Sequence, residues 1–398
     1  VLIRQLRKRR KMTWKVSNHI CLSVLLVCLV IIFSGCVSEK NHNKTTEEKG
    51  TYLYSEDILY AEGFMIDYYK EYTRVTLNNP WLDNQEPYAV YYLLKNDTVE
   101  TPAEGVRVFT PLTSIAVNTF SYFDFLSLIG NLENVTGVTD GFRIYNREIL
   151  ENIKDGKIVD LGDPFNPNIE NTIALNPQAV INSAYAQMDN YSVRLNQAGF
   201  PVIYSLEWME NSPLARAEWI KMIAAFFDKK TLADSVFNDI EQRYLAVKEI
   251  ANEVNQRRTV MTGDIFQGTW YVPGGKSFNA ALYRDAGLDY RYENNNLSGS
   301  IGLDIESVLT QFGDTDIWFG CEAGSYSDLS AKDSKYMLMQ PVAKKQVFNN
   351  HNRTTKTGGN DYFESAIAHP DLVLSDLVKA AYPYMLPDYS FTYIKPLN

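Results

Sequence analysis

The sequence predicts an α/β protein in which two α/β halves flank a helical middle. From Tyr52 onward, short apolar runs alternate with stretches of helical periodicity, a pattern typical of mainly parallel sheets covered by helices. Residues 212–254 contain no strand pattern, and their apolar residues recur at helical spacing instead. A short motif occurs once in each half at corresponding places, which indicates that the two halves are related lobes.

The candidate strands are short runs of β-branched, aliphatic and aromatic residues. They comprise residues 106–109, 179–181, 202–204, 259–262 and 316–319. The helical middle begins at Ser212, an N-cap residue that is followed by Pro213 at the first helical position. A second helix begins at Thr231, where Asp234 approximates a capping box, and its apolar stripe continues to Val254.

The motif that the two halves share is a helix start followed by a strand. Asn168 and Asp304 are residue types that cap helices. Glu170 and Glu306 fall in the first turns, where a negative charge is favourable, and an apolar strand follows each helix. This repetition favours the duplication of one lobe.

The first 35 residues have the pattern of a secretion signal, which starts at either Val1 or Met12. They carry seven basic side chains and no acidic one, and residues 20–33 form an uncharged apolar run. That run is shorter than the roughly 20 residues that a helix needs to cross a bilayer. The next three residues end in Cys36 and resemble a bacterial lipoprotein signal, which is cleaved before the cysteine and lipidated on its thiol. The alternative is an uncleaved membrane anchor.

The remainder of the chain is strongly acidic. The full sequence holds 38 basic and 48 acidic side chains, and seven of the basic ones lie in the signal, so the remainder carries 31 basic against 48 acidic groups. Such a body repels phosphate backbones, so nucleic acid is not an expected partner. Residues 36–51 are polar and are expected to form a flexible tether. Cys321 is the only cysteine after Cys36, so no intramolecular disulfide is expected.

Motifs of nucleotide binding, metal binding and catalysis are missing from the sequence. The Gly-Gly-Lys-Ser run around Gly275 imitates a phosphate-binding loop, but Trp270 stands where that loop needs its first glycine. Outside the signal, only His42, His351 and His369 offer imidazole, so neither a zinc nor a manganese site is expected, and His369 is expected to be structural. No spacing singles out a catalytic group. We therefore expect neither enzymatic activity nor a cofactor.

Aromatic residues make up 13% of the chain, and many follow candidate strands rather than lying on helical faces. Ligands of parallel α/β sheets bind beyond the carboxyl ends of the strands, and aromatic loops there suit a large, partly planar ligand. Each aromatic residue could instead pack on its own lobe, but the set favours a cleft. The set comprises Phe165, Tyr185, Phe266, Trp270, Tyr271, Tyr362 and Phe363.

The order of these features resembles the bacterial ABC-importer substrate-binding proteins for ferric siderophores, haem and vitamin B12, over roughly residues 100–385. In the first half, residues 108–114 resemble the family's Ser/Thr-Pro loop. Residues 168–181 resemble its segment N-x-E-x-I-x-x-L-x-P-D-x-V-I, with Gln178 in place of the usual aspartate. Residues 195–203 resemble its segment L-x-x-x-G-I-P-V. In the second half, the matching segments are 304–309, like S-x-E-x-L, and 360–364, like the D-W-F-E cleft loop of vitamin B12-binding proteins with Tyr362 for tryptophan.

The resemblance implies two Rossmann-like lobes joined by a single long α-helix, with the ligand cleft between the lobes and small lobe movements. The implied parts are a signal at 1–35, a tether at 36–51, an N-terminal lobe at 52–211, a linker helix at 212–228 and a C-terminal lobe at 229–398. Residues 52–105 would be an addition to the family pattern, and strand patterns at 72–77 and 88–94 predict a hairpin there. By matching motif positions, the ligand-binding residues would be Thr113, Phe165, Tyr185, Trp270, Tyr271, Asp361 and Tyr362.

The resemblance also implies a function without chemistry. The protein would be a monomeric lipoprotein outside the cytoplasm, held to the membrane by its lipid, that delivers its ligand to an ABC permease and its ATPase. Docking in this family uses one acidic residue per lobe, for which Asp189 and Glu306 are the candidates. The alternatives are an extracytoplasmic lipoprotein hydrolase on an α/β scaffold and a ligand sensor with the same two-lobe fold.

The ligand itself is open at this point between a ferric siderophore, haem and cobalamin. Haem would call for an axial ligand, which Tyr271 or Tyr362 could supply. A negatively charged ferric chelate would call for a cation in the cleft, for which Arg143 and Lys276 are candidates.

Overall fold

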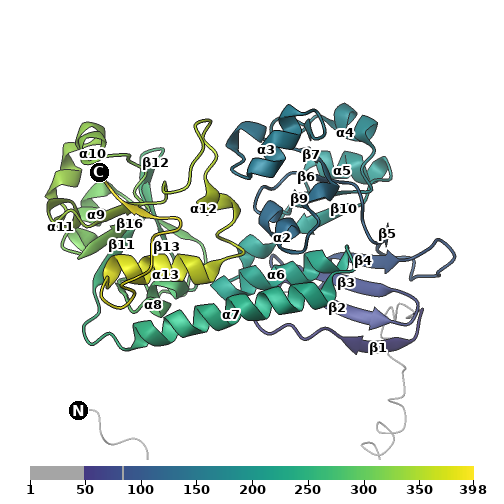
Figure 1. The fold of residues 1–398 in the computed structure, drawn as a ribbon, viewed down its shortest axis with the longest axis horizontal. Helices are drawn as coiled ribbons and strands as arrows, with labels where there is room; N and C mark the ends of the chain where they lie inside the picture. Colours follow the sequence, from purple (N-terminus) through teal and green to yellow (C-terminus); the bar gives the residue numbers. More distant parts are fainter. Residues whose placement is uncertain (1–48, 83–84) are drawn as a thin grey trace, which may run out of the picture. The chain divides into compact units, whose positions relative to one another are not determined.

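Three five-stranded sheets and one three-stranded sheet form the framework of residues 49–82 and 85–398, which are the residues that the computed structural model describes (Figure 1). The predicted α/β class with parallel sheets in two lobes is confirmed. The predicted signal, the lipidation site Cys36 and most of the tether lie outside the described residues. Within the described ranges, no helix combines the length and the apolar character that a membrane span requires.

The N-terminal lobe is built on a fully parallel sheet in the order β10-β9-β6-β7-β8. Strands β6, β9 and β10 are buried almost throughout, which explains why they are continuous apolar runs. In its register, Val117 lies opposite Ile181. The strands are β6 (Ile115–Val117), β7 (Val135–Val138), β8 (Val159–Asp160), β9 (Ala179–Ser183) and β10 (Val202–Ser205). The helices of this lobe are α2 (Tyr122–Leu128), α3 (Arg147–Lys154), α4 (Ile169–Leu175) and α5 (Asn190–Gln197).

The C-terminal lobe repeats this plan with the order β14-β11-β16-β17-β18, in which only the last pair is antiparallel. The strands are β11 (Thr259–Thr262), β14 (Asp289–Tyr290), β16 (Ile317–Phe319), β17 (Val347–Asn349) and β18 (Lys395–Pro396). A small antiparallel sheet contains β12 (Ile265–Phe266), β13 (Thr269–Pro273) and β15 (Ser300–Leu303). The helices are α8 (Phe278–Asp285), α9 (Ile305–Phe312), α10 (Tyr326–Lys332), α11 (Gln340–Ala343), α12 (Asp361–Glu364) and α13 (Pro370–Ala381).

The motif shared by the two halves begins a helix in each lobe, as predicted. The side chain of Asn168 accepts a hydrogen bond from the amide nitrogen of Asn171 at 2.9 Å, and α4 follows. The side chain of Asp304 accepts one from the amide nitrogen of Ser307 at 2.7 Å, and α9 follows. Each cap satisfies a backbone donor that the first helical turn leaves unpaired.

The segment that precedes the N-terminal lobe is larger than the predicted hairpin. Strands are present near both predicted places, but they belong to a separate five-stranded sheet in the order β1-β2-β3-β4-β5. The run 106–109 forms the last strand of this sheet, parallel to its neighbour, and so does not open the N-terminal lobe. The strands are β1 (Tyr52–Ser55), β2 (Phe64–Tyr69), β3 (Thr73–Asn78), β4 (Pro87–Leu94) and β5 (Val106–Phe109). We call this unit the added sheet.

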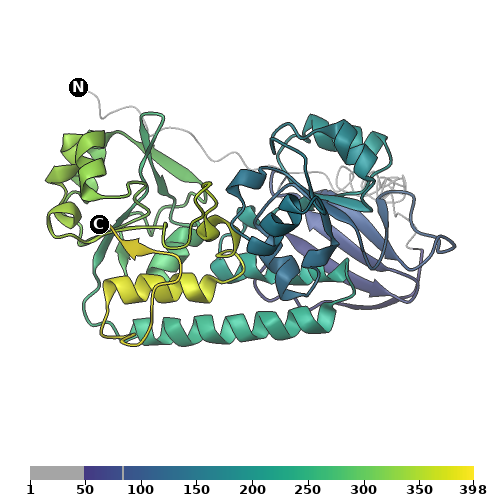
Figure 2. The same ribbon diagram turned by 45° about the horizontal axis from the view of Figure 1, so that its top comes forward.

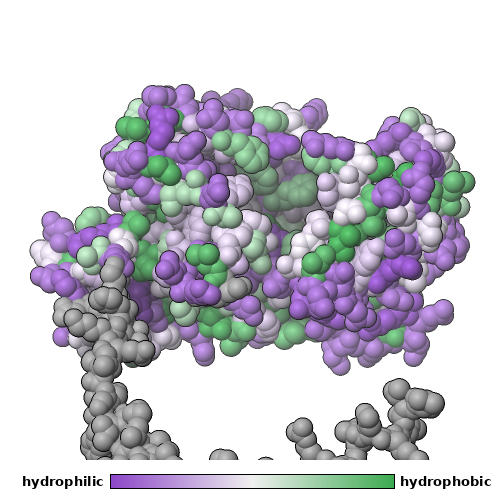
Figure 3. Space-filling model, turned by 180° about the vertical axis from the view of Figure 1, so that it is seen from behind, coloured by the Kyte–Doolittle hydropathy of each residue, from purple (hydrophilic) through white to green (hydrophobic). Residues whose placement is uncertain are grey.

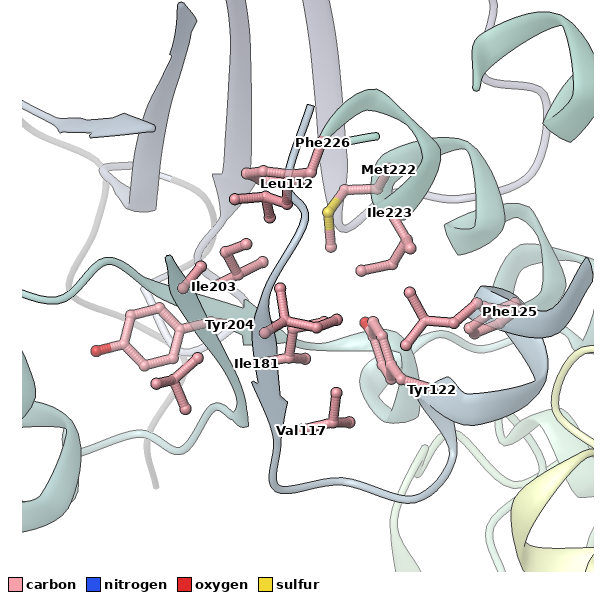
Figure 4. Close-up of a cluster of buried hydrophobic side chains, with 14 of the residues drawn as sticks. Leu112, Val117, Tyr122, Phe125, Ile181, Ile203, Tyr204, Met222, Ile223 and Phe226 are labelled. Carbon is pink, nitrogen blue, oxygen red and sulfur yellow. The ribbon is translucent and has the colours of Figure 1, made fainter. Parts of the chain in front are cut away.

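Two helices, α6 and α7, contribute side chains to the cores of both lobes. Helix α6 (Pro213–Ala225) places Leu214 in the C-terminal core, whereas Met222 and Ile223 pack with Tyr122 and Phe125 of α2 in the N-terminal core (Figure 4). Because α6 is covered by both lobes and by α7, it is apolar almost all round.

Helix α7 (Lys230–Asn252) runs beside α6 and α13 (Figures 1 and 2). Its Phe237 lies in the N-terminal core and its Tyr244 in the C-terminal core. The prediction that this helix belongs to the second lobe alone was therefore wrong. It spans both lobes because its apolar stripe continues over its full length of 23 residues.

The segment 56–63, between β1 and β2, binds α6 through buried carboxylates. Glu218, which is fully buried, accepts hydrogen bonds from the amide nitrogens of residues 59, 60 and 61 at 2.7–2.9 Å. It also lies 2.9 Å from the ammonium nitrogen of Lys221. Glu210, just ahead of α6, accepts from the amide of Gly63 and from the indole nitrogen of Trp219, both at 2.9 Å. We call this segment the strap.

Candidate ligand-binding cleft

The carboxyl ends of the parallel strands carry exposed aromatic side chains in both lobes. A ligand of an α/β sheet binds at this edge, where the loops diverge. In the N-terminal lobe, the aromatic residues that follow β7, β8, β9 and β10 are Phe142, Phe165, Tyr185 and Trp208. In the C-terminal lobe, those that follow β11 and β17 are Phe266, Tyr271 and Phe363. The expectation of aromatic loops after strands is therefore met by both lobes.

An apolar cavity of about 280 Å³ lies where α6 meets the C-terminal lobe. Its walls come from α6, α8, α12 and α13 and include Phe278, Tyr362 and Phe363. A second cavity of about 180 Å³ adjoins it at the carboxyl ends of β11 and β16, and Tyr362 and Phe363 line both. The smaller cavity is also lined by the polar residues Asn279, Glu322 and Asn350. We call the pair the apolar cavities after the walls of the larger one. Figure 3 shows a hollow on one face of the molecule with hydrophobic residues in its depth.

Arg216 is the one cationic side chain in the lining of the larger cavity. Its guanidinium carbon lies 4.1 Å from the centroid of the Phe278 ring, so the ring covers one face of the cation. Its Nε atom is sealed from solvent and has no hydrogen-bond partner. Burial lowers the pKa of the Arg216 guanidinium, and the charge of Glu207 opposes that shift. An arginine keeps its charge under such conditions, so the cavity holds a positive group in apolar surroundings.

A polar cluster connects the two lobes beside these cavities, around a space of about 220 Å³. From the N-terminal lobe, Asp124 places a carboxylate oxygen 2.9 Å from Nε2 of His369. Also from that lobe, the amide nitrogen of Tyr145 donates to Glu364 at 2.7 Å. Arg353 lies 3.4 Å from the Tyr145 hydroxyl and 3.0 Å from Asp361. We call this group the inter-lobe cluster.

Burial and neighbouring charges together shift the pKa values of the inter-lobe cluster. It raises the pKa of the Glu364 carboxyl to about 8, and it also raises that of Asp361. Burial alone lowers the pKa of His369, but the carboxylates of Asp124 and Asp371 outweigh it, so the pKa of this imidazole lies above its usual value. Among the described residues, no group of three histidine, cysteine or carboxylate side chains is arranged to hold a metal ion.

Two of the predicted ligand-binding residues lie together. Tyr362 lines both apolar cavities, and its neighbour Asp361 lines the space of the inter-lobe cluster, where its side chain is almost fully buried. Tyr271 is 43% exposed on β13, and Tyr185 and Phe165 are exposed in loops of the N-terminal lobe. None of these last three lines either apolar cavity.

Trp270 and Thr113 are corrections. Strand β13 alternates between inward and outward side chains, and it turns Trp270 into the core, where its indole nitrogen donates to the carbonyl of Thr262. Thr113 precedes β6, and its amide donates to the side chain of Gln178, which precedes β9. Thr113 and Gln178 therefore lie at the amino edge of the sheet, opposite the edge where ligands bind. The loop that follows the first strand of the lobe is 118–121 instead.

The two candidates for docking both have partners within their own lobe. Asp189 caps α5 by accepting a hydrogen bond from the amide of Ser192 at 2.8 Å. Glu306 pairs with Lys335 at 2.7 Å. Their role in docking stays a prediction. Of the two candidate cations, Arg143 lies 3.5 Å from Asp140 and Lys276 is exposed, and neither lines an apolar cavity.

Arg216 and Phe278 were missed by the sequence analysis. The available signal was the charge content of helix α6, which carries Arg216, Glu218 and Lys221 in an otherwise apolar stretch. Since Glu218 and Lys221 pair with each other, Arg216 is the charge left over. His369 was expected to be structural. It immediately precedes α13, and its imidazole also contacts Asp124 across the lobes.

Comparison with known proteins agrees with this architecture. The chain is 25% identical over 399 residues to an uncharacterized lipoprotein of Methanocaldococcus jannaschii, covering 92% of each chain. Among solved structures, it is similar to the periplasmic haem-binding protein of Roseiflexus sp. RS-1 in its apo form, with a TM-score of 0.54 and 15% identity over 69% of this chain and 99% of that chain. A possible iron-binding (periplasmic solute-binding) protein of Staphylococcus epidermidis gives a TM-score of 0.53 and 17% identity over 69% of this chain and 100% of that chain.

These structural likenesses concern the fold, and they agree with the two-lobe architecture that the sequence resemblance implies. The sequence model of the periplasmic binding proteins matches residues 115–352, which is more than half of the chain. The chain therefore belongs to the periplasmic binding protein family.

Proposed function

We propose that this protein is the lipid-anchored substrate-binding component of an ABC importer, which captures an iron complex or cobalamin and delivers it to a membrane permease. The observation that carries the proposal is the pair of apolar cavities lined by Tyr362 and Phe363, of which the smaller lies at the carboxyl ends of β11 and β16. Apolar walls with a few polar groups are typical of sites for small molecules and cofactors.

The comparisons support an iron complex as the first ligand to test. The Roseiflexus protein is described as haem-binding and the Staphylococcus epidermidis protein as possibly iron-binding. Tyr362 is the candidate axial ligand that lines the cavities, so haem would find both an apolar wall and a phenol there. The lipid anchor at Cys36 is supported by the Methanocaldococcus jannaschii relative, which is named a lipoprotein.

The test is a calorimetric titration of the purified protein without its predicted signal and tether, residues 1–51. The probes are haemin, a ferric hydroxamate siderophore, a ferric catecholate siderophore and cyanocobalamin. We expect a one-to-one complex with one of these probes, and we expect Phe363→Ala to weaken it. Binding of none of them would overturn the proposal. Co-purification with a permease in detergent extracts of the native membrane would then test delivery, with Glu306→Lys as the variant for docking.

A further inference from the structure

The guanidinium group of Arg216 carries a charge that none of its contacts within the described residues neutralises. The three buried carboxylates on or near α6 are engaged elsewhere. Glu207 accepts from the hydroxyls of Ser121 and Ser205, Glu210 from backbone and indole nitrogens, and Glu218 from the strap. No ion pair or hydrogen bond of the Arg216 side chain exists among the residues that the structure describes. Leaving such a charge unpaired in apolar surroundings costs stability.

The geometry around Arg216 leaves it able to bind an anion. Phe278 covers one face of the guanidinium at 4.1 Å, which holds its plane without using its N–H groups. Its partly exposed atoms reach the larger apolar cavity, which Arg216 lines together with Pro213 of the same helix. A planar fork of N–H donors in this position matches a carboxylate, which accepts two parallel hydrogen bonds.

We infer that Arg216 is the receptor for an anionic group of the ligand, a carboxylate or a similar oxyanion carried on an aromatic or aliphatic arm that fills the larger cavity. This inference rests on the proposed binding function and adds the place and the charge of one ligand group. It also makes α6 part of the site, since Arg216 reaches the cavity from the same helix whose Met222 and Ile223 lie in the N-terminal core. A ligand held there contacts the linker helix and the C-terminal lobe together.

The inference has two independent consequences for Arg216→Met. If the charge exists for a ligand, the neutral and similarly long methionine removes a partly buried charge that has no partner in the protein, so the melting temperature rises. The same variant loses charge-assisted hydrogen bonds to the ligand, which corresponds to about a 10- to 100-fold weaker affinity. Arg257→Met is the matched control, because Arg257 is exposed in the loop before β11, at the opposite edge of the sheet.

The experiment uses two pairs of probes, haemin against haemin dimethyl ester and 4-phenylbutyrate against 4-phenylbutyramide. We expect wild-type protein to prefer each carboxylate over its neutral partner and Arg216→Met to lose that preference, while Arg257→Met keeps it. Binding of 4-phenylbutyrate supports the inference even if haemin and every siderophore fail to bind, a result that would sink the proposed function alone. Equal affinity of wild type and Arg216→Met for both carboxylates, or a lowered melting temperature without a loss of preference, overturns the inference.

Discussion

The hydroxyl group of Tyr91 donates a hydrogen bond to the carbonyl oxygen of Val202 at 2.9 Å and accepts one from the amide nitrogen of Tyr204 at 3.0 Å. Tyr91 comes from β4 of the added sheet, whereas the other two residues belong to β10, the edge strand of the N-terminal lobe. A side chain thus takes the place that a neighbouring strand would occupy. The added sheet is thereby fixed to the lobe through backbone groups that would otherwise be buried without partners.

Tyr91→Phe is expected to destabilise the protein by about 1–3 kcal/mol, because it leaves a buried donor and a buried acceptor unpaired. The measurement is the free energy of unfolding in urea. Tyr384→Phe removes a hydroxyl from a side chain that is 72% exposed and is expected to change that free energy by less than about 0.5 kcal/mol. Equal effects of the two variants would contradict the role given to Tyr91.

Glu218→Gln is expected to cost about 3–5 kcal/mol, since Lys221 would remain as a buried charge without its partner. The double variant Glu218→Gln/Lys221→Met removes both charges and is expected to recover a large part of that loss. Denaturation curves of the two single variants and the double variant give the coupling free energy directly. An additive outcome would show that the pair does not act as a unit.

The contact between His369 and Asp124 is expected to make stability depend on pH. The pKa of the His369 imidazole is raised in the folded protein. The stabilisation that this imidazole contributes is therefore fully present below its usual pKa near 6.5 and is lost as the pH rises through the raised pKa. Asp371 adds to this effect, whereas Arg243 opposes it. His369→Gln should therefore lower the melting temperature more at pH 6 than at pH 9. A loss of melting temperature that is larger at pH 9 than at pH 6 would contradict the raised pKa of His369.

Glu364 provides a second titration with a separate test. Burial raises its pKa to about 8, so the folded protein binds one more proton than the unfolded chain between roughly pH 4.5 and 8, and stability falls with rising pH there. Glu364→Gln keeps an oxygen that can accept from the amide of Tyr145 but cannot ionise. We expect this variant to gain stability over wild type as the pH rises from 5 to 8.5. A constant difference over that range would contradict the raised pKa.

Two aromatic residues distinguish the cleft seen in the structure from the one inferred by motif matching. Phe363 lines both apolar cavities, whereas Phe165, predicted from the sequence, is 83% exposed and lines neither. We expect Phe363→Ala to weaken binding of the identified ligand about tenfold or more and Phe165→Ala to leave it unchanged. The dissociation constants of both variants, measured by calorimetry, decide between them, and the reverse order of effects would favour the loop of the N-terminal lobe.

Features that depend on a few neighbouring residues could be predicted from the sequence. The caps at Asn168 and Asp304 and the start of α6 at Ser212 all follow local hydrogen-bonding rules, and all are found. The residue after a strand also lies at its carboxyl edge whatever the partner strands are, which is why aromatic loops were found in both lobes.

Features that depend on distant partners could not be predicted. The runs 106–109 and 115–117 are similar in composition, and only their pairing assigns the first to the added sheet and the second to the N-terminal lobe. Because the sequence pattern predicts the first run as a strand of the lobe, it places Thr113 at the ligand-binding edge. The isolation of Arg216 likewise depends on where the strap and Ser205 place their donors. A charge is unpaired only with respect to a complete tertiary structure.

The presence of α7 beside α6 has a mechanical consequence. Two helices that pack against each other and against both lobes resist bending more strongly than one helix, because a hinge motion would force α6 and α7 to slide along their shared packed surface. The strap adds a further brace on α6. We expect the empty and the ligand-bound protein to have nearly the same outline, so that a partner that distinguishes the two states would have to contact the ligand or the residues around it.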